Sequence, residues 1–478
     1  MDTKQELIFE YLRDQTRVLG LRSKSFVFNP DGKARPKRTS FTKLNNFIDS
    51  FLQKTQKQRI CILSGLRGAG KTTLLYQLYT QSHINCEKLF VSVDHIANFL
   101  KVSLFEFLIT YENLMGQRFE ELKQPLIIFL DEVQSDPDWA QTLKLIYERT
   151  DKVLIVATGS SALLFEISSD LARRSLLEEI HPLSFLEFLE IDQGIVIERG
   201  LGQKLTNIFL HSKNAKDFYL QFSSLEKSLK KQLLSFDSLI VDRFIKYGSL
   251  PFMLSNNNEA DCYQQIYRLI DRIIHEDLCH FGDFSRETLN QVQSILYTLA
   301  EFDQTSSKTI VEITGLSKPT LIELFQALGK SKLIRRIMPY GSHKSQVNKI
   351  SKYLFSAPAF RSMYFNQIGN LAQDYMGKLL EDLVSMYLTR IFSSNSSFSL
   401  TYDAAEGGAD FILGLGKSAI ICEVGSGKKS FRQISKSAKK VTNLKFTINI
   451  TRSKQLKLSE QGDAVQLPLE YLLLTQCD

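Results

Sequence analysis

Residues 65–72 have the residue types and spacing of a loop that binds phosphate groups. They read Gly-Leu-Arg-Gly-Ala-Gly-Lys-Thr, follow a short apolar run at Ile60–Leu63 and precede an amphipathic helical pattern. The glycines allow the backbone to turn its N–H groups toward phosphate oxygens, and the N-terminus of the following helix adds a favourable dipole. In such a loop the lysine reaches the β- and γ-phosphates, and the hydroxyl residue after it binds Mg²⁺.

This pattern predicts a site for ATP and Mg²⁺. Lys71 is expected to contact the phosphates and to assist hydrolysis, and Thr72 to place its hydroxyl on the magnesium ion. A plain glycine turn between a strand and a helix would not need every position of the motif to be filled. The predicted nucleotide-binding residues are Gly65, Gly68, Ala69, Gly70, Lys71, Thr72 and Thr73.

A second apolar run ends in two acids, which is the other half that such a site requires. Residues 124–134 read QPLIIFLDEVQ, so a buried strand at Leu126–Leu130 leads directly into Asp131 and Glu132. Asp131 is expected to hold Mg²⁺ through water, and Glu132 to polarise the water that attacks the phosphate. A charged strand end alone would carry no function, but at about sixty residues after a phosphate loop it becomes specific.

A third apolar run, KVLIVATGSSALL, ends in small polar residues. A polar side chain there, at Ser160, could lie between two strands and sense the γ-phosphate. Beyond it, Arg173 and Arg174 are each able to stabilise phosphate charge in their own subunit or toward a neighbouring one, although adjacent arginines also occur simply on surfaces. The alternation of apolar runs with helical segments predicts a parallel sheet with helices on both faces.

The composition indicates a globular protein with several domains. The chain has 478 residues, 43% of them hydrophobic and 23% charged, and this length favours about three domains. No apolar run approaches the roughly 18 residues that span a bilayer, and the charged opening reads as a helix and not as a secretory signal. The six cysteines show no CxxC pair, which favours buried thiols in a reducing compartment. We therefore expect a cytoplasmic protein without a membrane partner.

Positive charge is concentrated in the C-terminal third, although the net charge is only +7. Residues 424–457 contain ten Lys or Arg and residues 330–352 contain seven, and neither stretch contains an acid. Such runs are often solvated surface. Two of them in one part of the chain favour a polyanionic partner, and DNA is the partner we predict.

Two acids near the C-terminus raise the question of a second metal site. In the stretch ADFILGLGKSAIICEVGSGKK, Asp410 opens one apolar strand-like run and Glu423 closes the next. Metal-dependent nucleases present paired carboxylates to a divalent cation in this way, and usually carry a lysine two residues after the second acid. That position is Gly425 in this chain.

Four stretches together resemble a family of prokaryotic AAA-type ATPases that is often grouped with the signal-transducing STAND-like ATPases. They are LSGLRGAGKTTLL, IIFLDEVQSDPDWAQTLKLIYERTD, VATGSSALL and LARRSLLEEIHPLSFLEFL. Members of the family have an ATPase core, a winged helix and a restriction-endonuclease-like domain, and the resemblance extends over about residues 55–470. It supports the roles given above to Lys71, Thr72, Asp131, Glu132 and Ser160. Its usual Gly-Arg pair falls on Arg173 and Arg174, so Arg174 is the arginine that the resemblance implies.

The resemblance also bears on the second metal site. Glu381, in the helical pattern YMGKLLEDLVSMYLTRI, matches a glutamate of the family, so the possible metal ligands become Glu381, Asp410 and Glu423. The chain departs from the family at Gly425, where a lysine is usual, and at Gly408, where a glutamate is usual. Two departures favour an inactive nuclease-like domain kept as a basic binding module.

An active nuclease remains the alternative, because a lysine can migrate to a neighbouring element. Lys428 or Lys436, in the helical pattern that follows Glu423, could reach the carboxylates. Mg²⁺- or Mn²⁺-dependent cleavage that is lost on replacing Asp410 would support it.

Between the ATPase motifs and these acids, residues 306–342 read helix, turn, helix and strand, which is a winged-helix pattern. Ile310, Val311 and Ile313 are expected to pack the first helix, and Gly315 to turn the chain. The basic residues of the expected wing, which suit phosphate contact, are Lys332, Arg335, Arg336 and Lys344.

The fold class predicted is α/β, with a P-loop NTPase parallel-sheet core, a helical lid, a winged helix and a C-terminal α/β restriction-endonuclease-like domain. The expected parts are an N-terminal helix and exposed basic linker (1–55), the AAA-type ATPase core (56–190), a helical lid or arm (191–300), the winged helix (301–345) and the nuclease-like domain (346–478).

The function predicted is ATP binding and hydrolysis coupled to DNA binding through the winged helix and the basic C-terminal domain. A slow STAND-type regulatory switch that acts on a protein partner is the main alternative, and homo-oligomers are compatible with either.

Overall fold

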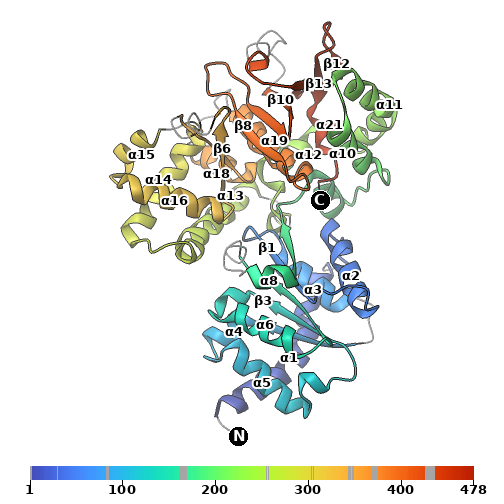
Figure 1. The fold of residues 1–478 in the computed structure, drawn as a ribbon, viewed down its shortest axis with the longest axis vertical. Coiled ribbons are helices and arrows are strands. Elements are labelled where there is room, and N and C mark those ends of the chain that lie inside the picture. The colour runs from blue at the N-terminus through green and yellow to red at the C-terminus, as the bar shows by residue number, and fades with distance from the viewer. Residues whose placement is uncertain are drawn as a thin grey trace. The chain divides into compact units, whose positions relative to one another are not determined.

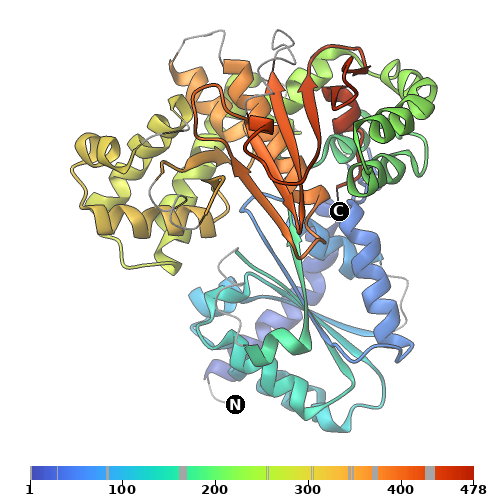
Figure 2. The same ribbon diagram turned by 45° about the horizontal axis from the view of Figure 1, so that its top comes forward.

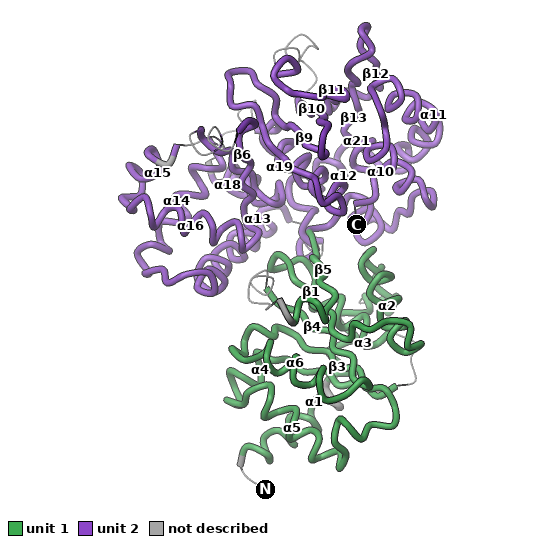
Figure 3. The backbone as a smooth tube through the Cα atoms, in the orientation of Figure 1, with its two compact units in different colours: residues 1–181 green, residues 182–478 purple. Residues whose placement is uncertain are grey.

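The computed structural model divides the chain into two compact units, residues 1–181 and 182–478 (Figure 3). It describes residues 3–29, 31–81, 86–160, 169–254, 256, 258–302, 304, 306–342, 346, 349–368, 375–425 and 437–477. Three lysines with predicted roles, Lys344, Lys428 and Lys436, lie outside the described residues. Each unit is described by itself below.

The first unit is built on a parallel sheet whose five strands have the order β2-β3-β4-β1-β5. All residues of β1, β3 and β4 are buried, as expected of strands covered on both faces. The parallel pairing and the predicted strand positions are confirmed. The strands are β1 (Ile60–Gly65), β2 (Glu87–Ser92), β3 (Leu126–Asp131), β4 (Val153–Thr158) and β5 (Ser175–Ile180).

Helices cover both faces of this sheet, as predicted (Figures 1 and 2). The segment before β1 is also part of the unit, because α1 packs on α3 and α5, and Ile8 and Tyr11 join the core beneath the sheet. The helices are α1 (Thr3–Val27), α2 (Thr39–Leu52), α3 (Lys71–Gln81), α4 (Val93–Asn98), α5 (Leu104–Met115), α6 (Trp139–Arg149) and α8 (Ser169–Arg174), with short turns η1 (Phe119–Glu121) and η2 (Val133–Ser135).

The second unit contains a mixed sheet of eight strands in the order β12-β13-β11-β10-β9-β8-β6-β7. Strands β8, β9 and β10 are antiparallel neighbours, whereas β11 runs parallel to β10 and to β13. The strands are β6 (Ile334–Pro339), β7 (Lys352–Phe355), β8 (Phe398–Tyr402), β9 (Phe411–Leu415), β10 (Ser418–Gly425), β11 (Leu444–Thr451), β12 (Lys457–Leu458) and β13 (Ala464–Pro468).

Helices make up the rest of this unit, and residues 191–300 are helical as predicted. They are α9 (Phe185–Gln193), α10 (Leu201–His211), α11 (Ala215–Leu233), α12 (Ser238–Arg243), α13 (Glu259–Arg272), α14 (Arg286–Glu301), α15 (Ser307–Thr314), α16 (Lys318–Lys330), α18 (Pro358–Ile368), α19 (Tyr375–Ile391) and α21 (Leu469–Leu473). Shorter helical segments are the π-helical η3 (Phe244–Gly248) and η5 (Ile273–Asp277) and the 3-10 helical η4 (Pro251–Met253) and η6 (Leu278–His280).

The segment predicted as a winged helix forms α15, α16 and the hairpin β6–β7. Gly315 ends α15 at φ 69°, as expected for a turn that needs a left-handed residue. The expectation for Ile313 was wrong: this side chain is 53% exposed, while Ile310 alone of the three apolar positions is buried. Strand β6 also pairs with β8, through Met338 and Thr401, so the hairpin is continuous with the C-terminal sheet.

No helix among the described residues is long and apolar enough to cross a membrane. The five-part division of the chain stays a prediction. The compact units group its parts differently, because α1 and α2 lie with the first sheet and α9 lies with the second unit.

Candidate active site

The phosphate loop lies at the carboxyl end of β1, between that strand and α3. Gly65 has φ 144°, and a Cβ there would collide with the carbonyl oxygen of Ile180 on the neighbouring strand β5. Gly68 and Gly70 also have positive φ, 80° and 91°. The loop therefore needs glycine at these positions because of its backbone conformation and its close approach to β5.

Lys71 is the first residue of α3, and its side chain turns back over the loop. Its Nζ donates to the carbonyl oxygens of Gly65 and Leu66, at 3.0 and 3.1 Å, and the residue is buried. The ammonium group is thus held above the loop in which the phosphates are expected to bind.

Asp131 is the centre of a hydrogen-bonded network at the same edge of the sheet. The Thr72 hydroxyl donates to its Oδ1 at 3.1 Å, and the Thr158 hydroxyl donates to the same oxygen. Burial raises the pKa of the Asp131 carboxyl to about 6, with a contribution from the neighbouring Glu132 charge, and the two hydroxyls oppose this shift. The sequence reasoning had given Thr158 no role. Its position as the last residue of the neighbouring strand β4 was the signal.

Glu132 has an unusual backbone conformation next to this network. Its φ is 56° and its ψ is 51°, a left-handed geometry that is uncommon for a residue with a side chain. Its N–H donates to the Thr158 hydroxyl at 3.2 Å. The Gln134 side chain donates from Nε2 to the Glu132 carboxylate, and its Oε1 accepts from the N–H of Ser160 at 3.3 Å. The structure thus brings Glu132 and the predicted sensor Ser160 to one edge of the sheet.

Arg174 does not join this group. It lies directly before β5, whose first residue Ser175 pairs with Ile60 at the amino end of β1. The phosphate loop begins five residues later along β1, about 17 Å away. Arg174 instead donates to Glu148 of α6 at 2.6 Å. It therefore lies at the opposite edge of the sheet from the nucleotide site of its own chain.

Arg38 contacts the phosphate loop, which the sequence reasoning missed. That reasoning took residues 29–40 as an exposed linker, but Arg38 is 7% exposed. Its guanidinium donates to the Ala69 carbonyl at 2.7 Å and to the His181 carbonyl at 2.9 Å. The sequence gives little signal for this role, because Arg38 stands in a run of basic and turn-forming residues.

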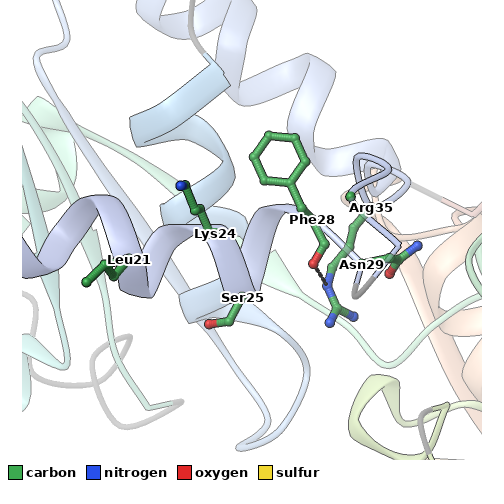
Figure 4. A pocket seen from close by; sticks show the side chains of 7 residues that line it. Leu21, Lys24, Ser25, Phe28, Asn29 and Arg35 are labelled. Atoms are coloured by element: carbon green, nitrogen blue, oxygen red, sulfur yellow. Dashed lines mark hydrogen bonds between the residues drawn. The ribbon is translucent and has the colours of Figure 1, made fainter.

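A pocket of about 630 Å³ lies at the end of α1, away from the predicted nucleotide ligands (Figure 4). Within it the Arg35 Nε donates to the Phe28 carbonyl at 3.2 Å. None of the residues that line it belongs to the phosphate loop, so it is not the predicted phosphate site. They are Leu21, Lys24, Ser25, Phe28, Asn29, Gly32 and Arg35.

The three acids of the possible second metal site do not form a metal-holding cluster. No group of three or more His, Cys, Asp or Glu residues in the described part of the chain is placed to hold a metal ion. Asp410 and Glu423 continue the register of the β9–β10 pair, beyond Phe411 and Cys422. Glu423 lies on β10 between Cys422 and Val424, which pack in the same core as α19, so alternation along the strand turns its side chain to the face opposite α19, which carries Glu381.

Glu381 is paired with a lysine that the sequence reasoning did not consider. Lys352, the first residue of β7, forms an ion pair with Glu381, and its side chain is 3% exposed. Lys352 also borders a pocket of about 470 Å³ that includes Asp403 and Asp410. Asp410 accepts a hydrogen bond from the Val424 N–H at 2.8 Å.

A family model described as an AAA domain matches residues 57–189. A protein of Methanocaldococcus jannaschii, "Uncharacterized protein MJ1637", is 34% identical over 445 residues, which cover 92% of this chain and 89% of the relative. An "Uncharacterized protein" of Haemophilus influenzae is 27% identical over 213 residues, covering 41% and 49% of the two chains.

Two solved structures that match are more distant. The Thermotoga maritima RuvB Holliday junction branch migration motor has 15% identity and a TM-score of 0.26, covering 63% of this chain and 89% of that chain. Caenorhabditis elegans PCH-2 has 12% identity and a TM-score of 0.25, covering 65% and 72%.

Proposed function

The chain belongs to the family of MJ1637 and has an AAA domain at residues 57–189, and from this premise we propose that it binds and hydrolyses ATP and couples the nucleotide state to DNA binding. The coupling would use the hairpin-bearing segment after α14 and the basic C-terminal sheet. A cytoplasmic location fits this proposal.

The observation that carries the proposal is the network of Thr72, Asp131 and Thr158 beside the phosphate loop. It brings a hydroxyl and a buried carboxylate, both oxygen ligands, to the edge where the loop turns. Oxygen ligands of this kind suit Mg²⁺. Thr72 and Asp131 would hold the ion, which supplies positive charge that stabilises the phosphate oxygens during hydrolysis.

The residues of the chain itself would act in three ways. Lys71 would move from the loop carbonyls to the β- and γ-phosphates, because a phosphate is a stronger partner for an ammonium group than a neutral carbonyl. Glu132 would orient the attacking water and accept its proton. Ser160 would report on the γ-phosphate from the end of β4.

Arg174 fits a role toward a neighbouring subunit better than a role in its own. Its side chain is 25% exposed, and its own nucleotide site lies at the other edge of the sheet. A homo-oligomer in which this edge faces the phosphate loop of the next copy would bring it to the phosphates.

DNA is proposed as the partner because of the acid-free basic stretches. Within residues 424–457, Lys440 and Arg452 are paired with Asp403 and Asp242, whereas Lys439 and Lys454 are exposed. Phosphate contacts by such residues would make binding strongly dependent on salt. The nuclease-like sheet is proposed to serve this binding without cleavage, since its three acids are not gathered into a metal site.

The test is phosphate release from ATP with and without duplex DNA at low salt, with Glu132→Gln as the blank. Strong stimulation by DNA that fades with added salt supports the coupled function. Hydrolysis that is indifferent to DNA would remove DNA from the proposal and favour a regulatory switch that acts on a protein. DNA cleavage with Mn²⁺, lost in Asp410→Ala, would contradict the inactive nuclease-like domain.

A further inference from the structure

Gln134 connects the carboxyl ends of the neighbouring strands β3 and β4, near which Glu132 and Ser160 lie. It lies in η2, two residues after Glu132, and its carboxamide has two partners. Its Nε2 donates to the Glu132 carboxylate, and its Oε1 accepts from the Ser160 N–H at 3.3 Å. One planar group therefore contacts both the proposed catalytic base and the backbone at the end of β4.

The backbone of Glu132 is fixed independently of this link. Its left-handed conformation is held by the hydrogen bond from its N–H to Thr158 and by the Ser135 N–H, which donates to the Glu132 carbonyl at 3.1 Å. This leaves the side chain, with its three rotatable bonds, as the freely turning part. Among the residues that the structure describes, the side chain that hydrogen-bonds to the carboxylate itself is that of Gln134.

We propose that Gln134 is a positioning residue that fixes the orientation of the Glu132 carboxylate relative to Ser160. The proposed base is then oriented by a hydrogen bond to the end of β4, where the γ-phosphate is proposed to bind. This inference depends on the proposed ATPase function and adds a residue to it. Gln134 does not touch ATP in this scheme. It acts through Glu132, because the amide donates to one carboxylate oxygen and leaves the other oxygen for water.

The chemistry of an amide suits this role better than that of a similar side chain. The carboxamide of Gln or Asn offers a donor and an acceptor on one planar end and stays uncharged at every pH at which the protein is folded. A carboxylate at position 134 could still accept from the Ser160 N–H but could not donate to Glu132. An apolar side chain of similar volume, such as that of leucine, could do neither. These two replacements therefore separate the bond to Glu132 from the bond to Ser160.

The experiment compares Gln134→Leu and Gln134→Glu with the wild-type chain. Steady-state phosphate release gives kcat, and titration with a fluorescent ATP analogue gives the Kd. Gln141→Leu is the matched control, since Gln141 is an exposed residue of the nearby helix α6. The thermal midpoint of each variant reports whether it is folded.

The expected result is a kcat about 10- to 100-fold lower in both Gln134 variants. The Kd of Gln134→Leu should stay within about two-fold of the wild type, because the residue does not bind the nucleotide. Gln141→Leu should match the wild type in both measurements.

Three results would overturn the inference. A wild-type kcat in Gln134→Glu would mean that hydrolysis depends on the hydrogen bond to Ser160 and not on the one to Glu132. A wild-type kcat in Gln134→Leu would mean that hydrolysis depends on neither hydrogen bond. A Kd raised in proportion to the loss of kcat in Gln134→Leu would assign it a merely structural role in the loop. A wild-type chain that releases no more phosphate than Glu132→Gln would instead refute the proposed function itself, and the inference with it.

Discussion

The Arg38 guanidinium donates a hydrogen bond to the carbonyl oxygen of Ala69, at 2.7 Å, and so ties the segment before α2 to the phosphate loop. Its other amino group donates to His181 at the end of the first unit. A residue outside the sequence motif thus stabilises the loop through a hydrogen bond to its backbone. The phosphate loop is held by glycine geometry and by this buried cation together.

Replacing Arg38 with Ala should weaken both the fold and the nucleotide site. Two charge-assisted hydrogen bonds of a buried side chain are lost, so the free energy of unfolding should fall by about 2–4 kcal/mol. The Kd for a fluorescent ATP analogue should rise, because the loop loses a support. Lys33→Ala is the control, since that side chain is 83% exposed. An Arg38→Ala chain as stable as this control would contradict the assigned role.

Replacing Thr158 with Val should lower ATP hydrolysis while keeping the side-chain shape. The variant removes the hydroxyl that donates to Asp131 and leaves the Glu132 N–H without its acceptor. We expect a loss of about 1–3 kcal/mol in stability and a clear fall in kcat. Thr158→Ser keeps the hydroxyl and should retain most of the activity. If Ser and Val behave alike in phosphate release, the hydroxyl has no catalytic importance.

Replacing Asp131 with Asn should stabilise the metal-free protein at neutral pH. The folded-state pKa of Asp131 is about 6, above its ordinary value of 3.8. Between these two values the unfolded chain has lost the proton and the folded chain still holds it, so stability falls as the pH rises through this window and stays lower above it. The Asn variant escapes this loss, which amounts to about 3 kcal/mol.

The measurement is chemical unfolding with EDTA and without nucleotide, at several values between about pH 3.5 and pH 7.5. The stability difference between Asp131→Asn and the wild type should grow across pH 4–6 and then level off. The same variant should lose ATP hydrolysis, because it lacks the carboxylate that is proposed to hold Mg²⁺. An Asn variant that is less stable than the wild type at pH 7 would show that ionisation of the buried carboxyl group does not lower the stability of the folded protein.

Much of the first unit could be predicted from the sequence because its signals are local. The phosphate loop and the strand ending at Asp131 are contiguous motifs with a fixed relation to strand and helix. What the sequence could not reveal is which residues meet from distant segments. Arg38 and Ala69 are far apart in the chain, and so are Gln134 and Ser160, so their hydrogen bonds depend on the packing of whole elements.

In the second unit the order of elements was predictable, but the side-chain partners of the acids were not. The runs around Asp410 and Glu423 are strands, as predicted, and Glu381 is on a helix. The sequence contained the residue types of a metal site, but it did not show toward which face of the sheet each side chain points. Alternation along β10 decides that face for Glu423, and it separates this acid from Glu381 on α19.

Glu381 and Lys352 form a buried ion pair, and removing one partner alone should be costly. Their side chains are 18% and 3% exposed, and the Lys352 ammonium also lies 5.4 Å from the centre of the Phe411 ring. Lys352→Met leaves a carboxylate in a mostly dry position, which typically costs about 3–5 kcal/mol. Glu381→Gln leaves the ammonium instead, with a loss of similar size. The measurement is the free energy of unfolding from urea titration.

The double variant tests whether the pair itself or the packing around it matters. Lys352→Met with Glu381→Gln removes both charges, so it should recover a large part of the stability lost in Lys352→Met, because replacing a buried pair by uncharged groups is often nearly neutral. Additive losses would instead show that the two charges do not stabilise each other. A strong coupling free energy between the two residues would show that the charge of Glu381 is balanced by Lys352 of β7.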